Sequence, residues 1–230
     1  MPTTDFNDNW LFEGRDTVRL PHNAVELPFS YFDEKVYQRT FTYEKSFDAD
    51  PAWADREINV VFDGAMANAH VSLNGALLTK HKDGYTPFTA RLTGLLKPKA
   101  NKLSVIIDGS ENPEIPPFGG AIDYLTYAGI YREVWLNVTA AVSIGLHKIE
   151  TPDVLLPTKS VTIAATLNNP QNLALSGTLT ATLRDATGAT LANTTANITG
   201  PTAHLSLTNL ENITLWDTKT PALYTIDLIL

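Results

Sequence analysis

Cysteine is absent from this 230-residue chain. The chain can therefore form no disulfide, no thiolate zinc site and no cysteine nucleophile, and its composition is compatible with a reducing compartment. The first residues also lack the basic region and the apolar run of a secretory signal. We accordingly predict a cytoplasmic location. No segment approaches the roughly 18 consecutive apolar residues that a membrane span needs, so we expect no membrane partner.

Positive charge is scarce. The chain holds 17 lysine and arginine residues against 25 aspartate and glutamate residues, which gives a formal net charge of −8. This balance argues against nucleic acid or an anionic membrane surface as the main partner, because both are polyanions. A neutral ligand fits the charge better. Hydrophobic residues make up 43% of the chain and charged residues 18%, which is ordinary for a folded domain.

Familiar catalytic and cofactor motifs are missing as well. The sequence has no P-loop, no dinucleotide-binding glycine fingerprint, no His-Glu-x-x-His and no nucleophile-elbow serine. It shows no self-contained cation motif such as an EF-hand loop. The five histidines lack metal-ligand spacing, and we predict no metal ligand and no cofactor in this chain. These histidines are His22, His70, His81, His147 and His204.

Alternation of apolar and polar residues is present nearly everywhere, and it predicts an all-β protein. Residues 69–73 alternate and then meet Asn74-Gly75, a dipeptide that favours the positive φ angles of a tight hairpin turn. Residues 57–62 and 102–108 have the pattern of further strands. No amphipathic pattern extends beyond a couple of helical turns.

The composition changes after about residue 138, from rich in aromatic residues to rich in Thr, Ala, Leu and Asn. Residues 161–167, 179–183 and 224–230 alternate between apolar and polar side chains. Short strands at this spacing are typical of a β-sandwich. We therefore predict two all-β domains, residues 1–140 and residues 141–230.

One loop carries most of the functional information. Residues 118–129 are rich in glycine and aromatic residues, and they hold a single acid, Asp123, ahead of a predicted strand at residues 130–138. Small residues let the backbone approach a ligand, aromatic rings suit the faces of sugars, and a fixed carboxylate accepts hydrogen bonds from hydroxyls. Asp123 and Tyr124 are therefore candidates for contact with a ligand that carries hydroxyl groups.

Arg132 follows this loop on the predicted strand. It shares a face with Val134 and Leu136, the face expected to point inward. A guanidinium there needs a carboxylate or carbonyl partner, because an unpaired buried charge is costly. We predict that Arg132 supports the loop structurally and has no catalytic role.

Other acids and aromatic residues near this region have simpler explanations. Glycoside hydrolysis commonly uses two carboxylates held about 5–10 Å apart, but we interpret Glu111, Glu114 and Glu133 as solvated side chains, so no catalytic residue is predicted. Several aromatic residues could stack on sugars, although core packing is the default for most of them. They are Phe29, Tyr31, Phe32, Tyr37, Tyr85, Phe88, Tyr124 and Tyr127.

An ordered set of segments resembles glycoside hydrolase family 2, the family of β-galactosidases and β-glucuronidases. The first domain resembles its sugar-binding jelly-roll domain, a galactose-binding-like β-sandwich, and the second resembles its immunoglobulin-like β-sandwich. The matching segments are residues 10–12, 20–23, 37–41, 62–64, 69–75, 84–88, 123–134, 215–216 and 221–225.

The resemblance implies that catalysis lies outside this chain. In this family the two catalytic glutamates stand on a (β/α)₈ barrel that follows the immunoglobulin-like domain, and an aspartate in the position of Asp123 helps to bind the sugar. Leu230 falls within an alternating apolar segment, so we expect an inactive N-terminal fragment that supplies scaffold and part of the substrate pocket. The intact protein is expected to be a homo-oligomeric retaining β-glycosidase, and a bound Na⁺, Mg²⁺ or Ca²⁺ is left open.

Four parent activities or functions remain open at this point. We favour a β-galactosidase that hydrolyses terminal β-galactosides, because this is the commoner activity in the family. A β-glucuronidase is the nearest alternative. A stand-alone carbohydrate-binding protein without hydrolase activity is a second alternative, and a purely structural pair of β-sandwiches is a third.

Overall fold

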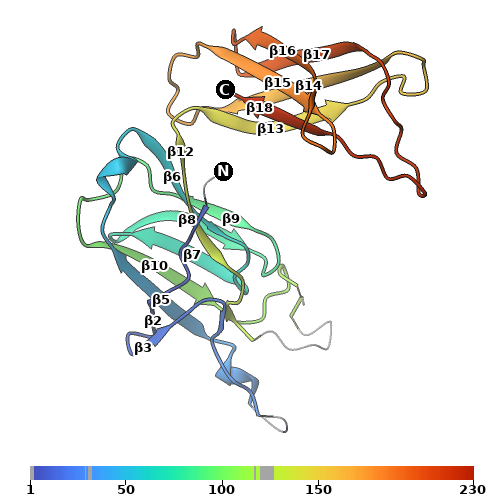
Figure 1. The fold of residues 1–230 in the computed structure, drawn as a ribbon. Helices are drawn as coiled ribbons and strands as arrows, with labels where there is room; N and C mark the ends of the chain where they lie inside the picture. Colours follow the sequence, from blue (N-terminus) through green and yellow to red (C-terminus); the bar gives the residue numbers. More distant parts are fainter. Residues whose placement is uncertain (1–2, 29, 31–32, 117, 120–126) are drawn as a thin grey trace. The chain divides into compact units, whose positions relative to one another are not determined.

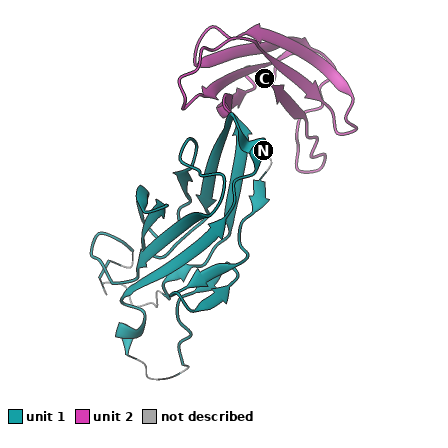
Figure 2. Cartoon of the chain, turned by 90° about the vertical axis from the view of Figure 1, so that its left-hand side faces the viewer, with its two compact units in different colours: residues 1–140 teal, residues 141–230 magenta. Residues whose placement is uncertain are grey.

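The computed structural model describes residues 3–28, 30, 33–116, 118–119 and 127–230. Regular structure in this part of the chain is almost entirely β-strand, and its helical segments are two three-residue 3₁₀ turns, Glu34–Val36 and Pro51–Trp53. The chain divides into two compact units, residues 1–140 and 141–230 (Figure 2). The predicted all-β class is confirmed.

A six-stranded antiparallel sheet forms one layer of the first unit (Figure 1). Its strand order is β3–β2–β5–β10–β7–β8. The bounds are β2 Trp10–Phe12, β3 Asp16–Val18, β5 Thr40–Phe47, β7 Asn68–Leu73, β8 Ala76–Lys82 and β10 Asn101–Asp108. Alternating burial along β10 shows that one face of this sheet is covered and the other is solvated.

A four-stranded sheet with the order β1–β12–β6–β9 forms the other layer. Its strands are β1 Thr3–Asp5, β6 Arg56–Phe62, β9 Phe88–Arg91 and β12 Val134–Ala140. A two-stranded ladder joins β4 His22–Asn23 to β11 Gly129–Ile130. Trp10, Phe41, Tyr43 and Phe62 are fully buried in one cluster that draws on both sheets, so the unit is the predicted sandwich with its core between the layers.

The hairpin between β7 and β8 confirms the predicted Asn-Gly turn. Asn74 and Gly75 both have positive φ, 52° and 88°, as a two-residue hairpin of this type requires. The Asn74 side chain adds two hydrogen bonds: its Nδ2 donates to Asn101 Oδ1 over 3.1 Å, and its Oδ1 accepts from the Lys102 amide over 3.0 Å. The turn is therefore tied to β10 as well as closing the hairpin.

Two three-stranded sheets make up the second unit, with the orders β13–β14–β17 and β16–β15–β18. The bounds are β13 Ser143–Glu150, β14 Lys159–Asn168, β15 Thr178–Arg184, β16 Thr190–Asn197, β17 Thr202–Leu210 and β18 Thr225–Ile229. Inward residues such as Ile163, Leu179 and Leu205 form a core that is separate from that of the first unit. This arrangement confirms the immunoglobulin-like β-sandwich.

The predicted strand at residues 130–138 is wrong in one respect that matters for Arg132. Two strands cover this region, β11 and β12, and residues 131–133 between them are not in a strand. The alternation of inward and outward side chains therefore does not continue from β11 through residues 131–133 into β12. Arg132 is exposed instead of pointing into the core with Val134.

Candidate functional site

Asp123 and Tyr124 lie outside the described residues, as do three of the candidate aromatic residues, Phe29, Tyr31 and Phe32. What the structure describes is the surrounding scaffold: both ends of the connection that carries Asp123, and the loop at residues 83–87. The connection runs between β10 and β11, over residues 109–128. Connections longer than about 12–15 residues are uncommon in compact domains unless they have a function.

The two ends of this connection meet in space. A Cβ placed on Gly109 would stand 2.6 Å from the Ala128 Cβ and 2.5 Å from the Tyr37 carbonyl oxygen. The Gly109 amide donates to the Arg39 carbonyl over 3.0 Å. Only glycine fits so close an approach. The connection therefore leaves the sandwich and returns to it at one point, as a closed loop.

Its returning end is clamped between two other segments. The Ala24 amide donates to the Ala128 carbonyl over 2.9 Å, and Gly129 exchanges hydrogen bonds with Met66 over 2.9 and 3.2 Å. Gly129 has a φ of 117°, and a Cβ there would stand 2.5 Å from the His22 carbonyl oxygen. The backbone of β4 and of the segment before β7 thus fixes the direction of the chain where the connection returns to the sandwich.

A histidine and a tyrosine lie beneath this clamp. His22 Nδ1 is 2.9 Å from the Tyr43 hydroxyl, and the Phe12 ring lies 4.9 Å from the His22 ring, centroid to centroid. Burial lowers the pKa of His22, although Asp16 and Glu26 act in the opposite direction. Burial also raises the pKa of Tyr43. Both groups are therefore held neutral, and His22 is a structural histidine of the sandwich.

The loop between β8 and β9 forms a second fixed element. Asp83 Oδ1 accepts from the Tyr85 amide over 2.9 Å, and the Thr86 hydroxyl donates to Asp83 Oδ2 over 3.2 Å. These short-range bonds give the loop a defined shape, because an aspartate can hold the backbone two residues ahead of it in a turn. Tyr85 is 46% exposed on that loop, so its ring is accessible.

Arg132 and Tyr131 connect this loop to the break before β12. Arg132 Nη1 donates to the Tyr85 carbonyl oxygen over 3.3 Å, and its stem passes over Gly64, where an added Cβ would stand 2.9 Å from the Arg132 Cδ. The Tyr131 hydroxyl donates to the Gly84 carbonyl. The structure thus gives Arg132 a carbonyl partner on the loop at residues 83–87. A role in supporting the loop of Asp123 stays a prediction.

The candidate aromatic residues separate clearly by burial. Tyr37 and Phe88 are core residues at 2% and 9% exposure. Tyr85 and Tyr127 are 46% and 42% exposed, and Phe118, which opens the predicted loop, is 45% exposed. Near the predicted loop, sugar contacts are therefore open to these three rings, and Phe118 and Tyr127 flank the undescribed segment that holds Asp123.

The three other acids considered near this loop differ in exposure. Glu114 pairs with Lys82 over 2.8 Å at the molecular surface, and this partner lowers the pKa of the Glu114 carboxyl. Glu133 is exposed and Glu111 is half-buried. Among the described residues no group of three or more His, Asp or Glu side chains could hold a metal ion. Nor does any helix in that part of the chain have the length and apolar character to cross a membrane.

Two β-sandwiches in series define the class of this chain as an all-β, two-domain region. The sequence family described as "Glycosyl hydrolases family 2, sugar binding domain" matches residues 8–140. A second description, "Glycosyl hydrolases family 2", matches residues 147–230. The chain therefore belongs to glycosyl hydrolase family 2, which confirms the resemblance seen in the sequence.

Its relatives include both activities that the family resemblance left open. The chain is 45% identical, over 97% of its length, to a beta-galactosidase of Rhizobium meliloti, and 35% identical, over 96% of its length, to a beta-galactosidase of Thermoanaerobacterium thermosulfurigenes. A solved structure of Bacteroides uniformis beta-glucuronidase 2 matches 99% of the chain with a TM-score of 0.78 and 25% identity, and 30% of that chain is covered. The chain spans about a third of the length of the two beta-galactosidases, 31% and 34%.

Proposed function

We propose that this chain is the non-catalytic part of a β-galactosidase that hydrolyses terminal β-galactosides. The observation that carries this proposal is the 45% identity to a beta-galactosidase over 97% of the chain. The activity is assigned to the intact protein, because this chain corresponds to only 31% of the length of that relative. By itself the 230-residue chain is expected to hydrolyse nothing.

Within that enzyme the first unit would supply part of the substrate pocket. The connection at residues 109–128 is closed at its base and clamped at Gly129, which suits a loop that must present groups in one position. Asp123 is the proposed acceptor of hydrogen bonds from sugar hydroxyls, and Tyr124 the proposed stacking partner. A carboxylate that accepts such bonds stabilises bound substrate without transferring a proton.

β-Glucuronidase is the second candidate activity. A specific observation favours retaining it, since a structure named as a beta-glucuronidase matches 99% of the chain with a TM-score of 0.78. The two substrates differ in the configuration of the 4-hydroxyl group and at C6, where the glucuronide carries a carboxylate in place of a hydroxymethyl group. The 45% identity to a beta-galactosidase, against 28% and 30% to a putative beta-glucuronidase and a beta-glucuronidase, supports β-galactosidase as the first candidate.

Hydrolysis by the intact protein separates these candidates. The purified intact protein is assayed with nitrophenyl β-galactoside and nitrophenyl β-glucuronide, and the 230-residue chain is assayed beside it. We expect kcat/KM for the galactoside to exceed that for the glucuronide by at least about 100-fold, since a site built for one polar group rejects an analogue that leaves it unpaired. The reverse preference would make the protein a β-glucuronidase, and activity against neither would contradict the proposal.

The stand-alone alternative predicts a different result for the 230-residue chain alone. A complete lectin site would bind free galactose, whereas half a pocket would not. Calorimetric titration of the 230-residue chain with galactose is therefore expected to show no binding at millimolar sugar. A cytoplasmic location, a homo-oligomeric parent and a bound Na⁺, Mg²⁺ or Ca²⁺ in that parent stay predictions.

A further inference from the structure

A small hydrophobic cluster lies apart from the main core of the first unit. Its buried members, at 3%, 7% and 3% exposure, are Met66, Ala67 and Ile115. The half-buried Tyr131 packs against them. The main core is a separate cluster formed by side chains of the two sheets, whereas all four of these residues lie outside the strands. The small cluster therefore packs connecting segments against one another.

Ile115 brings the first half of the connection at residues 109–128 to this cluster. The Ile115 amide donates to the Asn112 carbonyl over 3.0 Å, and the Phe118 amide donates to the Ile115 carbonyl over 2.7 Å. Two successive turns thus hold the backbone around Ile115 while its side chain is buried. The connection is therefore attached to the sandwich at Ile115 as well as at its two ends.

The loop at residues 83–87 is attached to the same small cluster. The Asp83 amide donates to the Ala67 carbonyl over 3.0 Å, where the loop begins. The Tyr131 hydroxyl donates to the Gly84 carbonyl, one residue further on. One small cluster therefore contacts both the loop and the connection, although the two segments are far apart in the sequence.

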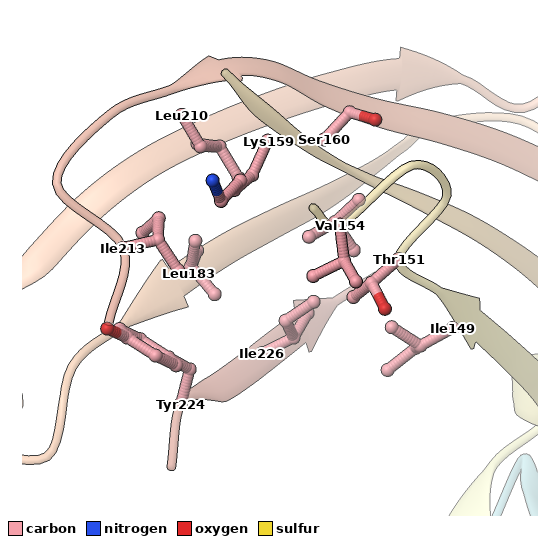
Figure 3. A pocket seen from close by; sticks show the side chains of 11 residues that line it. Ile149, Thr151, Val154, Lys159, Ser160, Leu183, Leu210, Ile213, Tyr224 and Ile226 are labelled. Atoms are coloured by element: carbon pink, nitrogen blue, oxygen red, sulfur yellow. The ribbon is translucent and has the colours of Figure 1, made fainter. Parts of the chain in front are cut away.

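The contact between the small cluster and the loop is closely packed. A Cβ added at Gly84 would overlap the Met66 Sδ and would stand 2.8 Å from the Tyr131 hydroxyl oxygen. The second unit is packed less closely in one place, where a cavity of about 210 Å³ has Leu183 and Ile226 among its apolar lining residues (Figure 3). A close-packed contact transmits displacement, because protein interiors have low compressibility. A shift on the connection side of the small cluster should therefore reach the loop.

We propose that the small cluster joins the connection and the loop at residues 83–87 into one rigid element, and that Ile115 is a positioning residue for substrate binding. Ile115 does not touch the sugar. It holds the connection that carries Asp123 in the place where substrate is bound. The positioning role rests on the proposed function, whereas the coupling between the two segments does not.

Hydrogen–deuterium exchange in the intact protein tests the coupling without any substrate. Ile115→Ala empties part of the small cluster, so we expect the amides of residues 83–87 to exchange at least about threefold faster. Ile58→Ala is the matched control, because it removes the same atoms, at 5% exposure, from the main core of the same unit. It should leave exchange at residues 83–87 within about twofold. Unchanged exchange in Ile115→Ala, or equal acceleration by both variants, overturns the proposal.

Kinetics in the intact protein tests the positioning role. With nitrophenyl β-galactoside we expect Ile115→Ala to raise KM at least about fivefold and to lower kcat by less, since a displaced binding group weakens the substrate and transition-state complexes alike. Ile58→Ala should change KM by no more than about twofold. Ile115→Leu nearly conserves the buried volume and should recover most of the loss.

A general loss of stability gives a different result. It would raise KM equally in Ile115→Ala and Ile58→Ala, and that outcome contradicts the positioning role, as does an unchanged KM in Ile115→Ala. If either alanine variant fails to fold, Ile115→Val and Ile58→Val make the same comparison with a smaller loss of buried side chain.

Failure of this inference and failure of the proposed function are separate results. If the intact protein cleaves glucuronides instead, the same comparison of KM is made with nitrophenyl β-glucuronide. If Asp123→Asn leaves hydrolysis unchanged while Ile115→Ala raises KM, the assignment of Asp123 fails and the role of Ile115 stands. Activity on neither glycoside overturns the positioning role together with the proposed function, and the exchange experiment still decides the coupling.

Discussion

Gly129 combines two constraints that a comparison with a second glycine can separate. Its φ of 117° is unfavourable for any residue with a Cβ, and a Cβ there would also meet the His22 carbonyl oxygen at 2.5 Å. Gly75 has a similar φ of 88° but open space around it. Alanine substitutions at these two positions therefore separate the cost of backbone strain from the cost of a steric clash at the end of the long connection.

We predict that Gly129→Ala lowers the free energy of unfolding of the first unit by about 3 kcal/mol or more. Gly75→Ala should cost only about 1 kcal/mol, because it adds strain without a clash. Urea unfolding followed by tryptophan fluorescence measures both values. Equal costs for the two variants would show that the clamp around Gly129 yields easily.

His22 gives the first unit a defined dependence on pH. Burial depresses its pKa in the folded protein below the ordinary value of about 6.5. The unfolded chain therefore binds the proton first as the pH falls, so the contribution of neutral His22 is fully present above about pH 6.5 and is lost below it. Asp16 and Glu26 favour the protonated form and reduce this effect without reversing it.

Replacement of His22 should remove that part of the pH dependence. We expect His22→Gln to flatten the fall in Tm between about pH 6.5 and pH 5, whereas His204→Gln, at an exposed site on β17, should leave the slope as it is. Thermal unfolding by circular dichroism across this range is the measurement. A slope that His22→Gln does not change would assign the acid sensitivity to other groups.

At the level of elements, turn chemistry decides where the hairpins close. The Asn74-Gly75 turn joins β7 to β8, and its side-chain bonds also reach Asn101 and Lys102 at the start of β10. Asn74→Ala removes both bonds and places alanine at a φ of 52°. We predict a loss of about 1–2 kcal/mol in the free energy of unfolding, measured by urea denaturation. Asn74→Gly should recover about half of that loss, because glycine tolerates the turn but cannot make the bonds.

Regular strands were predictable from the sequence because their signal is local. The pattern at residues 57–62 and 102–108 matches β6 and β10 closely, and the Asn-Gly turn is where it was expected. The two-residue strands β4 and β11 are too short to show any alternation, and only tertiary pairing creates them. The same pairing interrupts the strand before Arg132, which is why the inward position predicted for that residue is wrong.

The candidate site was predictable only in part. Asp123 stood out as the single acid in a glycine- and aromatic-rich segment, and its role there was implied by family resemblance. The glycines that fix the loop's two ends, Gly109 and Gly129, were not recognised as anchors. The sequence signal for these anchors was a long connection with a glycine at each end. The close approach of Gly109 to Ala128, however, depends on contacts between segments far apart in the sequence, which a local pattern does not show.

At the level of the whole molecule, the proposed function makes this chain one part of an active site that it shares with the rest of the intact protein. Each unit has its own hydrophobic core, so each can hold its loops in place without the other. The match of the sugar-binding domain description to residues 8–140 supports the proposal that the first unit contributes to substrate binding. Asp123 is the residue on which that contribution is proposed to depend.

Kinetics of Asp123→Asn in the intact protein is the measurement that tests this claim most directly. The change keeps the side chain's size and removes its charge. We predict that kcat/KM for nitrophenyl β-galactoside falls by about 100-fold or more with unchanged Tm, while Glu111→Gln on the same connection stays within about twofold of the parent protein. Unchanged hydrolysis by Asp123→Asn would contradict the account, because the loop would then carry no part of the substrate pocket.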